Sequence, residues 1–340
     1  MRRLRWIAAP LAALALVAAG CGDDDDGADE EGTDTEQTVP APDGIVVGAG
    51  VNDPDDSTIA VLEFLPEAIT IEAGTPVTWE WNGAEPHSVS FLPEGMEVPN
   101  VEEDPAAAEP APPTGPIDGT TYVSSGLQPL GPSAPTPFEG TFETPGTYDY
   151  ICIIHPNMTG EVTVVEAGGE ADTPADVAER RQSEMDQWLE EGRALKADLV
   201  DADPVQTELE DGSTEWTIEM GATTEHVDVL AFAPTPAGVE AGDTVTFVNN
   251  SFAPHTASFF MEGAEVVQSP FDERAVTPSP GPSPQALGAA GYFNTGVVPP
   301  DVGPPPEARR YSFTVPEPGT YPYVCIFHAP SQMVGEIEAT

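Results

Sequence analysis

The feature that most constrains this 340-residue chain is a long internal repeat. Residues 62–95 match residues 230–263 without gaps, at a constant offset of 168 positions. Further on, the segment PGTYDYICIIH at 145–155 corresponds to PGTYPYVCIFH at 318–328. A chain of this length suits two domains of ordinary size. The repeat therefore predicts two tandem copies of one domain, at 44–166 and 214–340.

Short apolar or alternating stretches rich in β-branched and aromatic residues indicate strands in each copy, such as TPVTWEW, HSVSF, GTYDYIC and GEVTVVE in the first. The 39 Pro and 32 Gly of the chain bound these stretches with turns and loops. Both observations predict an all-β fold in which each copy closes into a two-sheet β-sandwich. Large aromatic side chains within the strands are assigned to the cores: Trp79, Trp81, Phe91, Phe247 and Phe259.

Residues 167–213, between the copies, are predicted to form a linker with a helix over 174–199. Thr173 stands at the N-cap, Pro174 at the first helical position and Asp176 at the capping-box position. Four apolar residues at spacings of three, seven and four positions define one face of this helix: Met185, Trp188, Leu195 and Leu199. This face is expected to pack on one of the sandwiches, and a dimer seam is the alternative.

The N-terminus has the pattern of a bacterial export signal. Residues 1–20 begin with a basic stretch and continue with an apolar core too short to span a membrane comfortably. The run LVAAGC ending at Cys21 resembles a lipobox, which implies that this cysteine becomes lipidated. Residues 21–43 are densely acidic and are predicted to be a disordered tether. We expect an exported protein, lipid-anchored to the outer face of the cytoplasmic membrane.

The chain is strongly acidic, with 59 acidic and 10 basic side chains and a formal net charge of −49. Such a chain would repel the phosphate backbone of a nucleic acid, so nucleic-acid binding is excluded. The charge would attract a basic protein partner at low salt. The alternative is an acidic surface adapted to its medium.

Each copy carries two His, one Cys and one Met in a matching pattern. The first copy has His87 upstream and then CIIHPNM, and the second has His255 upstream and then CIFHAPSQM. Copper that alternates between its +1 and +2 states favours one thiolate, two imidazoles and a weak fourth ligand. The candidate ligands are His87, Cys152, His155 and Met158 in the first copy, and His255, Cys325, His328 and Met333 in the second. A disulfide between the two cysteines is an alternative, which their settings disfavour.

On these motifs, each copy resembles the cupredoxins, the plastocyanin, amicyanin and azurin family of blue copper proteins. The spacing C-x2-H-x2-M of the first copy is similar to amicyanin, and C-x2-H-x4-M of the second is similar to plastocyanin. The resemblance implies two tandem Greek-key β-sandwich domains and one type 1 copper site in each, with the methionines as axial ligands. Another axial group, with the methionines in the core, is the alternative.

The sequence departs from that family pattern at two places. The residue before the ligand cysteine, a tyrosine in plastocyanin, is Ile151 or Val324, which favours the edge of His155 or His328 as the port for electrons. The residue after the upstream histidine, an asparagine in plastocyanin and azurin, is a serine or a threonine. The hydrogen bonding around the copper, and hence its potential, is therefore left open.

The function that these features favour is the transfer of single electrons between redox proteins, with a basic, cytochrome-like protein as the kind of partner expected. A copper oxidase or nitrite reductase would need further histidines, and of five in the chain only His226 is left over. It is expected to be an ordinary strand or loop residue, so the chain is not expected to be an enzyme. Copper storage or delivery is the main alternative, although the seven methionines are scattered. The different lengths of the two methionine loops suggest different potentials, and the sequence does not predict the oligomeric state.

Overall fold

The computed structural model of the chain describes residues 44–340 except 102–103, 130–133, 236, 268–271, 282 and 302–303. The predicted export signal at 1–20, the tether at 21–43 and the lipidation residue Cys21 lie outside the described residues. In the described ranges, no helix combines the length and the apolar character needed to cross a bilayer.

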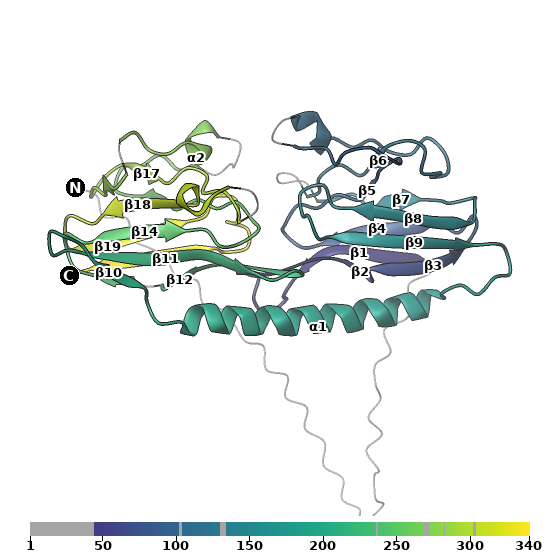
Figure 1. The fold of residues 1–340 in the computed structure, drawn as a ribbon, viewed down its shortest axis with the longest axis horizontal. Coiled ribbons are helices and arrows are strands. Elements are labelled where there is room, and N and C mark those ends of the chain that lie inside the picture. The colour runs from purple at the N-terminus through teal and green to yellow at the C-terminus, as the bar shows by residue number, and fades with distance from the viewer. Residues whose placement is uncertain are drawn as a thin grey trace, which may run out of the picture. The chain divides into compact units, whose positions relative to one another are not determined.

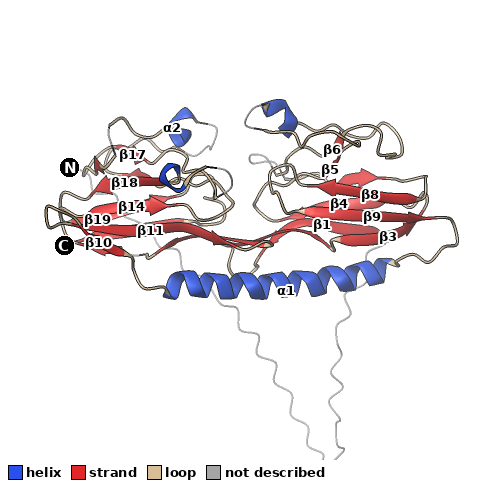
Figure 2. Ribbon diagram, in the orientation of Figure 1, coloured by secondary structure: helices blue, strands red, loops and turns tan. Residues whose placement is uncertain are grey.

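Strands dominate both halves of the chain, as expected for an all-β protein (Figure 2). The first half, residues 45–165, contains β1 (Ile45–Asn52), β2 (Ile59–Leu65), β3 (Ala68–Glu72), β4 (Val77–Asn82), β5 (Ser90–Phe91), η1 (Pro105–Ala108), β6 (Val123–Ser124), β7 (Phe138–Gly140), β8 (Gly146–Ile151) and β9 (Thr159–Val165). Helix α1 (Pro174–Asp201) follows.

The second half, residues 206–339, repeats this order of elements with small additions. It contains β10 (Gln206–Glu208), β11 (Thr214–Thr223), β12 (Val227–Ala233), β13 (Ala237–Val239), β14 (Thr244–Val248), β15 (Ser258–Phe260), α2 (Glu273–Val276), β16 (Gln285–Ala286), β17 (Tyr292–Asn294), η2 (Pro306–Ala308), β18 (Arg310–Thr314), β19 (Gly319–Val324) and β20 (Val334–Ala339).

The described residues form three sheets, and one of them is shared by both halves. The first half has a five-stranded sheet in the order β3-β9-β8-β5-β6, and the second has the equivalent β13-β20-β19-β15-β17. The third sheet runs β16-β18-β14-β11-β12-β2-β1-β4-β7, with β10 added on β11. The prediction that each copy closes into a sandwich by itself is thus wrong in one respect, because this sheet continues from one half into the other. An edge strand exposes unpaired backbone groups, and β2 and β12 satisfy theirs by pairing with each other.

The β2–β12 pairing is symmetric with respect to the repeat. Ala60 pairs with Asp228, which is 168 positions later, and Ile59 and Val61 pair with Val229 and Val227. Each strand therefore meets its own equivalent about a local two-fold axis, as in an isologous dimer. Equivalent loops of the two halves are consequently brought together at this seam.

Helix α1 covers the seam (Figure 1). It begins with the predicted capping box, in which Thr173 and Asp176 bond each other's backbone N–H. The sequence predicts that its apolar face packs on one of the sandwiches, and this is wrong. The face packs on strands of both halves, since Leu189 lies in one buried cluster with Ile59 of β2 and Val227 of β12. The helix is also tied to the loop after β1, where the Arg193 guanidinium is 2.6 Å from the Asp53 carboxylate.

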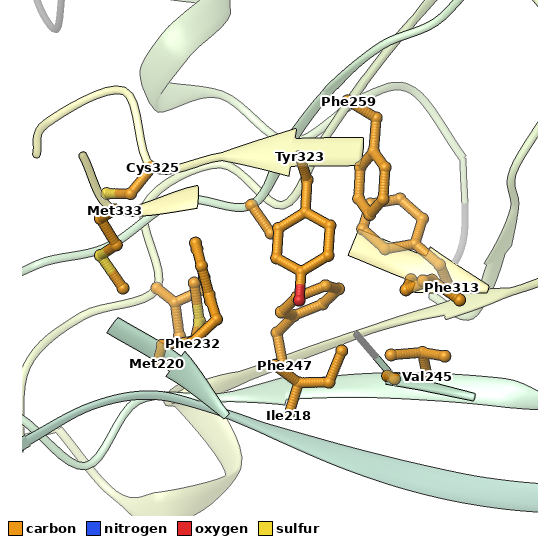
Figure 3. Close-up of a cluster of buried hydrophobic side chains, with 14 of the residues drawn as sticks. Ile218, Met220, Phe232, Val245, Phe247, Phe259, Phe313, Tyr323, Cys325 and Met333 are labelled. Carbon is orange, nitrogen blue, oxygen red and sulfur yellow. The ribbon is translucent and has the colours of Figure 1, made fainter. Parts of the chain in front are cut away.

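Each half has its own aromatic core between its two sheets. The predicted core residues Trp79, Trp81, Phe91, Phe247 and Phe259 are all buried. Figure 3 shows the second core, in which Tyr323 lies among Phe232, Phe247 and Phe259, and the sulfur atoms of Cys325 and Met333 lie at one end. The candidate metal ligands are thus attached directly to a rigidly packed core.

Candidate metal centres

The β8–β9 hairpin brings three of the predicted ligands of the first half together. Cys152 follows the last residue of β8, and His155 and Met158 lie in the turn before β9. The turn is closed by the backbone N–H of Cys152, which donates to the Met158 carbonyl at 2.9 Å. His87 reaches the same point from the segment before β5, because β5 pairs with β8.

The ligand atoms of the first half face one another. His87 Nδ1 lies 3.0 Å from His155 Nδ1, and Cys152 Sγ lies 3.4 Å from the same His155 atom. These three atoms lie within 4.8 Å of one another, and Met158 is fully buried beside them. Two imidazole nitrogens and a thiol converging in a buried space form the donor set that copper favours. The residues present therefore fit the metal.

The second half repeats this arrangement with a longer turn. His255 Nδ1 lies 3.0 Å from His328 Nδ1, and Cys325 Sγ lies 3.3 Å from His328 Nδ1 and 3.7 Å from His255 Nδ1. Gln332 adopts a φ of 61°, in the left-handed region, within the extra turn before Met333. The Cys325 backbone N–H then donates to the Met333 carbonyl at 3.0 Å, so both hairpins close in the same way.

Electrostatics favour the thiolate in both centres. Burial acts to raise the pKa of Cys152, but the charges of His155 and His87 outweigh it and hold this pKa well below its usual value. Burial also opposes ionisation of Cys325, and His328 again overcomes it, so that pKa is lowered too. A thiolate is the form of cysteine that binds metal. The lowered cysteine pKa therefore favours binding of a metal cation in each centre.

The residues after the upstream histidines hold the cysteine loops in place. The backbone N–H of Ser88 lies 3.4 Å from Cys152 Sγ, and that of Thr256 lies 3.4 Å from Cys325 Sγ. The hydroxyl oxygens of Ser88 and Thr256 accept the backbone N–H of Ile153 and Ile326, each at 3.0 Å. A short hydroxyl side chain thus connects the two ligand-bearing segments at the position where plastocyanin and azurin have an asparagine.

The outer nitrogens of the histidines have different partners in the two halves. His255 Nε2 lies 2.7 Å from the Ser251 hydroxyl, whereas the equivalent position in the first half is Gly83. His328 Nε2 lies 3.2 Å from the carboxylate of Glu85, which belongs to the first half. Such partners orient a ligand imidazole and tune its basicity.

Sequence reasoning missed two buried carboxylates at the seam. Glu85 is 7% exposed and Asp228 is 1% exposed. Burial opposes ionisation of Glu85, but His328 outweighs it and lowers its pKa. Burial raises the pKa of Asp228 to about 7. A comparison of the two copies could have singled out both residues. Ala253 stands at the position equivalent to Glu85, and Ala60 stands at the position equivalent to Asp228, so each carboxylate is present in one copy and absent from the other.

The structure corrects one expectation about electron ports. His328 is only 4% exposed, and the carboxylate of the first half covers its outer nitrogen. Its edge is therefore not an open port, because Glu85 covers it, and the equivalent residue Ala253 offers no such side chain to His155. His155 is partly exposed, and its role as a port for electrons stays a prediction.

His226 lies apart from both ligand sets. Its ring stacks on Trp188 of α1 with centroids 3.8 Å apart, and its Nδ1 lies 2.7 Å from the Glu63 carboxylate. The residue thus joins the helix to strands of both halves. Cys152 and Cys325 are both free and buried, as the ligand assignment requires.

Residues 54–165 match the copper-binding proteins of the plastocyanin/azurin family. Amicyanin-alpha of Methylorubrum extorquens is 35% identical over 106 residues, which cover 31% of this chain and 67% of that protein. Plastocyanin A'/A'' of Nicotiana tabacum is 31% identical over 108 residues, 32% of this chain and 86% of that protein. The chain therefore belongs to the plastocyanin/azurin family of copper-binding proteins.

A third relative is matched over a smaller share of its length, and a solved structure over a larger share than the first relative. The chloroplastic plastocyanin of Oryza sativa subsp. indica is 34% identical over 109 residues, and this chain spans about half of it, 54%. A solved structure of an oxidised amicyanin mutant has 22% identity and a TM-score of 0.24, covering 37% of this chain and 85% of that one.

Proposed function

We propose that this chain is an electron-transfer protein with two domains, 44–166 and 214–340, each holding one type 1 copper ion. The observation that carries the proposal is the presence of two sets of His, Cys and His donor atoms in a member of a copper-binding family. The atoms of each set lie within 4.8 Å of one another, and all six residues are buried except the partly exposed His155. When bound, copper supplies a centre that carries one electron by alternating between Cu(I) and Cu(II).

The chain's own contribution is to hold the donors still. Two imidazoles, a thiolate and a distant methionine form a compromise set that suits both oxidation states. In each half, the ligand hairpin is closed by the backbone hydrogen bond that Cys152 or Cys325 donates. The upstream histidines are held by backbone hydrogen bonds, His87 to Gln128 and His255 to Val298. A set that moves little between oxidation states transfers electrons rapidly.

The arrangement favours a carrier over an enzyme. Four of the five histidines belong to the two sets, and His226 is engaged with Trp188 and Glu63. Among the described residues, two groups of His, Cys and carboxylate side chains have metal-ligand spacing, and both are these sets. Copper storage or delivery is disfavoured because the sulfur ligands are fully buried, which would slow release of the metal.

The partners and location belong to the same proposal. An export signal at 1–20 and lipidation of Cys21 would hold the chain at the outer face of the cytoplasmic membrane, with residues 21–43 as a tether. A net charge of −49 would steer a basic redox protein, such as a cytochrome, toward it. Since His155 is partly exposed, its edge is the point at which we expect such a partner to dock.

Copper loading tests this function. The chain, expressed with its own leader and purified in detergent, should bind two copper ions, with an intense visible thiolate band and a narrow copper hyperfine pattern in its EPR spectrum. Cys152→Ser and Cys325→Ser should each retain one blue copper. A colourless product, or an ordinary type 2 copper signal, would contradict the proposal.

A further inference from the structure

The seam between the halves contains a direct contact between the two ligand sets. Glu85 belongs to the first half and lies two residues before the ligand His87. Its Oε2 is 3.2 Å from Nε2 of His328, a ligand of the second half whose Nδ1 faces the metal position. One hydrogen bond and a short peptide segment thus separate a ligand of one centre from a ligand of the other.

Several further contacts fix this junction. The Ser331 hydroxyl, in the ligand turn of the second half, donates to Oε1 of Glu85 at 3.2 Å. The Ser57 hydroxyl of the first half donates to the Ser331 carbonyl at 3.3 Å. Glu85, Ser331 and His328 are all buried. The turn that carries His328 and Met333 therefore packs against the first half, where hydrogen bonds and the contact with Glu85 hold it in place.

The junction exists on one side of the local two-fold axis. The position equivalent to Glu85 in the second half is Ala253, which has no polar side chain to offer His155. The Ala253 backbone N–H instead donates to the carboxylate of Asp228 at 3.1 Å. The two halves have the same kinds of metal ligands. They differ in the residue that each directs at the ligand histidine of the other half, which is Glu85 in the first half and Ala253 in the second.

We propose that the hydrogen bond from His328 to Glu85 joins the two centres into one electron-transfer unit within a single chain. The electron passes along this bond and along the peptide that links Glu85 to His87. One centre is oxidised by one electron and the other is reduced by one, while His328 keeps its Nε2 proton and Glu85 remains a carboxylate. This inference rests on the function proposed above.

Two physical reasons support this route and give it a direction. Electronic coupling decays less steeply along covalent and hydrogen bonds than across a nonbonded gap, and this path contains one hydrogen bond. A carboxylate bound to a ligand imidazole raises its basicity and so stabilises the oxidised metal. The second-half centre therefore has the lower potential, and electrons move from it to the first half, where His155 is accessible to a partner.

Internal electron transfer can be measured by reducing the copper-loaded chain partially with a rapid pulse and following the redistribution between the centres. A rate independent of protein concentration identifies transfer within one chain. Glu85→Ala should slow this phase about 10- to 100-fold, a loss of the size that removing a group bonded to a metal ligand causes in metal affinity or activity. The matched control is Glu63→Gln, another buried carboxylate paired with a histidine, which should leave the rate unchanged.

Glu85→Gln separates the route from the charge. The amide oxygen can still accept the His328 Nε2 proton, so transfer should persist, whereas loss of the charge should raise the midpoint potential of the second-half centre. A readout that involves no electron transfer is the His328 Nε2–H proton in the NMR spectrum of the zinc-loaded chain. It should exchange slowly in the wild type and in Glu85→Gln, and rapidly in Glu85→Ala.

The outcomes separate this inference from the proposed function. Two blue copper ions with no concentration-independent phase, or with the same rate in Glu85→Ala as in the wild type, would overturn the inference and leave the function intact. An unchanged second-half potential in Glu85→Gln would overturn the direction given to the transfer. Absence of blue copper would overturn the function itself.

Discussion

Gly192 is the residue at which α1 comes closest to the seam, and Gly192→Ala tests whether the helix packs on both halves. A Cβ built at this position would lie 2.4 Å from Ile59 Cγ2 and 2.8 Å from Val227 Cγ1. Ile59 comes from β2 and Val227 from β12, so the added methyl group would press on both sides of the β2–β12 pair. Ordinary carbon contacts are about 3.5 to 4.0 Å.

Two effects of this substitution oppose each other. Alanine is better than glycine in a helix interior by about 1 kcal/mol. Overpacking a well-filled core costs about 1 to 3 kcal/mol. Ile59 and Val227 are buried and β-branched, so neither side chain can turn away easily. The clash should win, and we expect Gly192→Ala to lower the free energy of unfolding by up to about 2 kcal/mol.

Urea denaturation of the metal-free chain measures this change. Ser183→Ala, at an exposed position of the same helix, reports the gain in helix propensity alone and should stabilise by about 0.5 kcal/mol. In an Ile59→Ala background, which removes the nearest methyl group, Gly192→Ala should become neutral or stabilising. If Gly192→Ala by itself stabilises the chain as much as Ser183→Ala does, the helix does not press on the seam and the packing argument is wrong.

Three further predictions follow from the seam, the helix cap and the ligands. The pKa of Asp228 is raised from 3.8 to about 7 by burial, so its contribution to stability is present below pH 3.8 and is lost as the pH rises through 7. Asp228→Asn should therefore stabilise the metal-free chain at pH 8 by about 4 kcal/mol and change little at pH 4, in urea denaturation at both pH values. Thr173→Ala removes the capping box and should lower the free energy of unfolding by about 1 kcal/mol in the same assay, whereas no change would show that the cap is dispensable. Redox titration of Cys152→Ser, which keeps the second centre, should give a lower midpoint than Cys325→Ser, and equal midpoints would contradict the asymmetry of the two centres.

The candidate ligands could be predicted from the sequence because their geometry is local. Cys152, His155 and Met158 share one hairpin turn, so their spacing alone places them together once the strands are recognised. The same holds for α1, whose start depends on Thr173 and the three residues after it. Signals of this kind need only the preferences of a strand, a turn or a helix end.

The seam could not be predicted because it depends on a partner that no local pattern specifies. β2 is buried along its whole length and apolar except for Glu63, which fits any buried strand and does not identify β12 as its neighbour. Without that pairing, Glu85 looks like one acidic residue among 59 acidic side chains. Its meaning appears only when the seam places it against His328.

The symmetric seam and the asymmetric groups around it have one physical consequence together. Pairing β2 with its own equivalent brings the same ends of both halves together, which shortens the path between the centres. Two identical centres would exchange electrons without a preferred direction. The halves differ in the groups near the Nε2 atoms of the histidines. Glu85 of the first half corresponds to Ala253 of the second, and Ser251 of the second half corresponds to Gly83 of the first. Since these groups act on ligand basicity and leave the ligand set unchanged, they can separate the two potentials while both centres remain fit to bind copper.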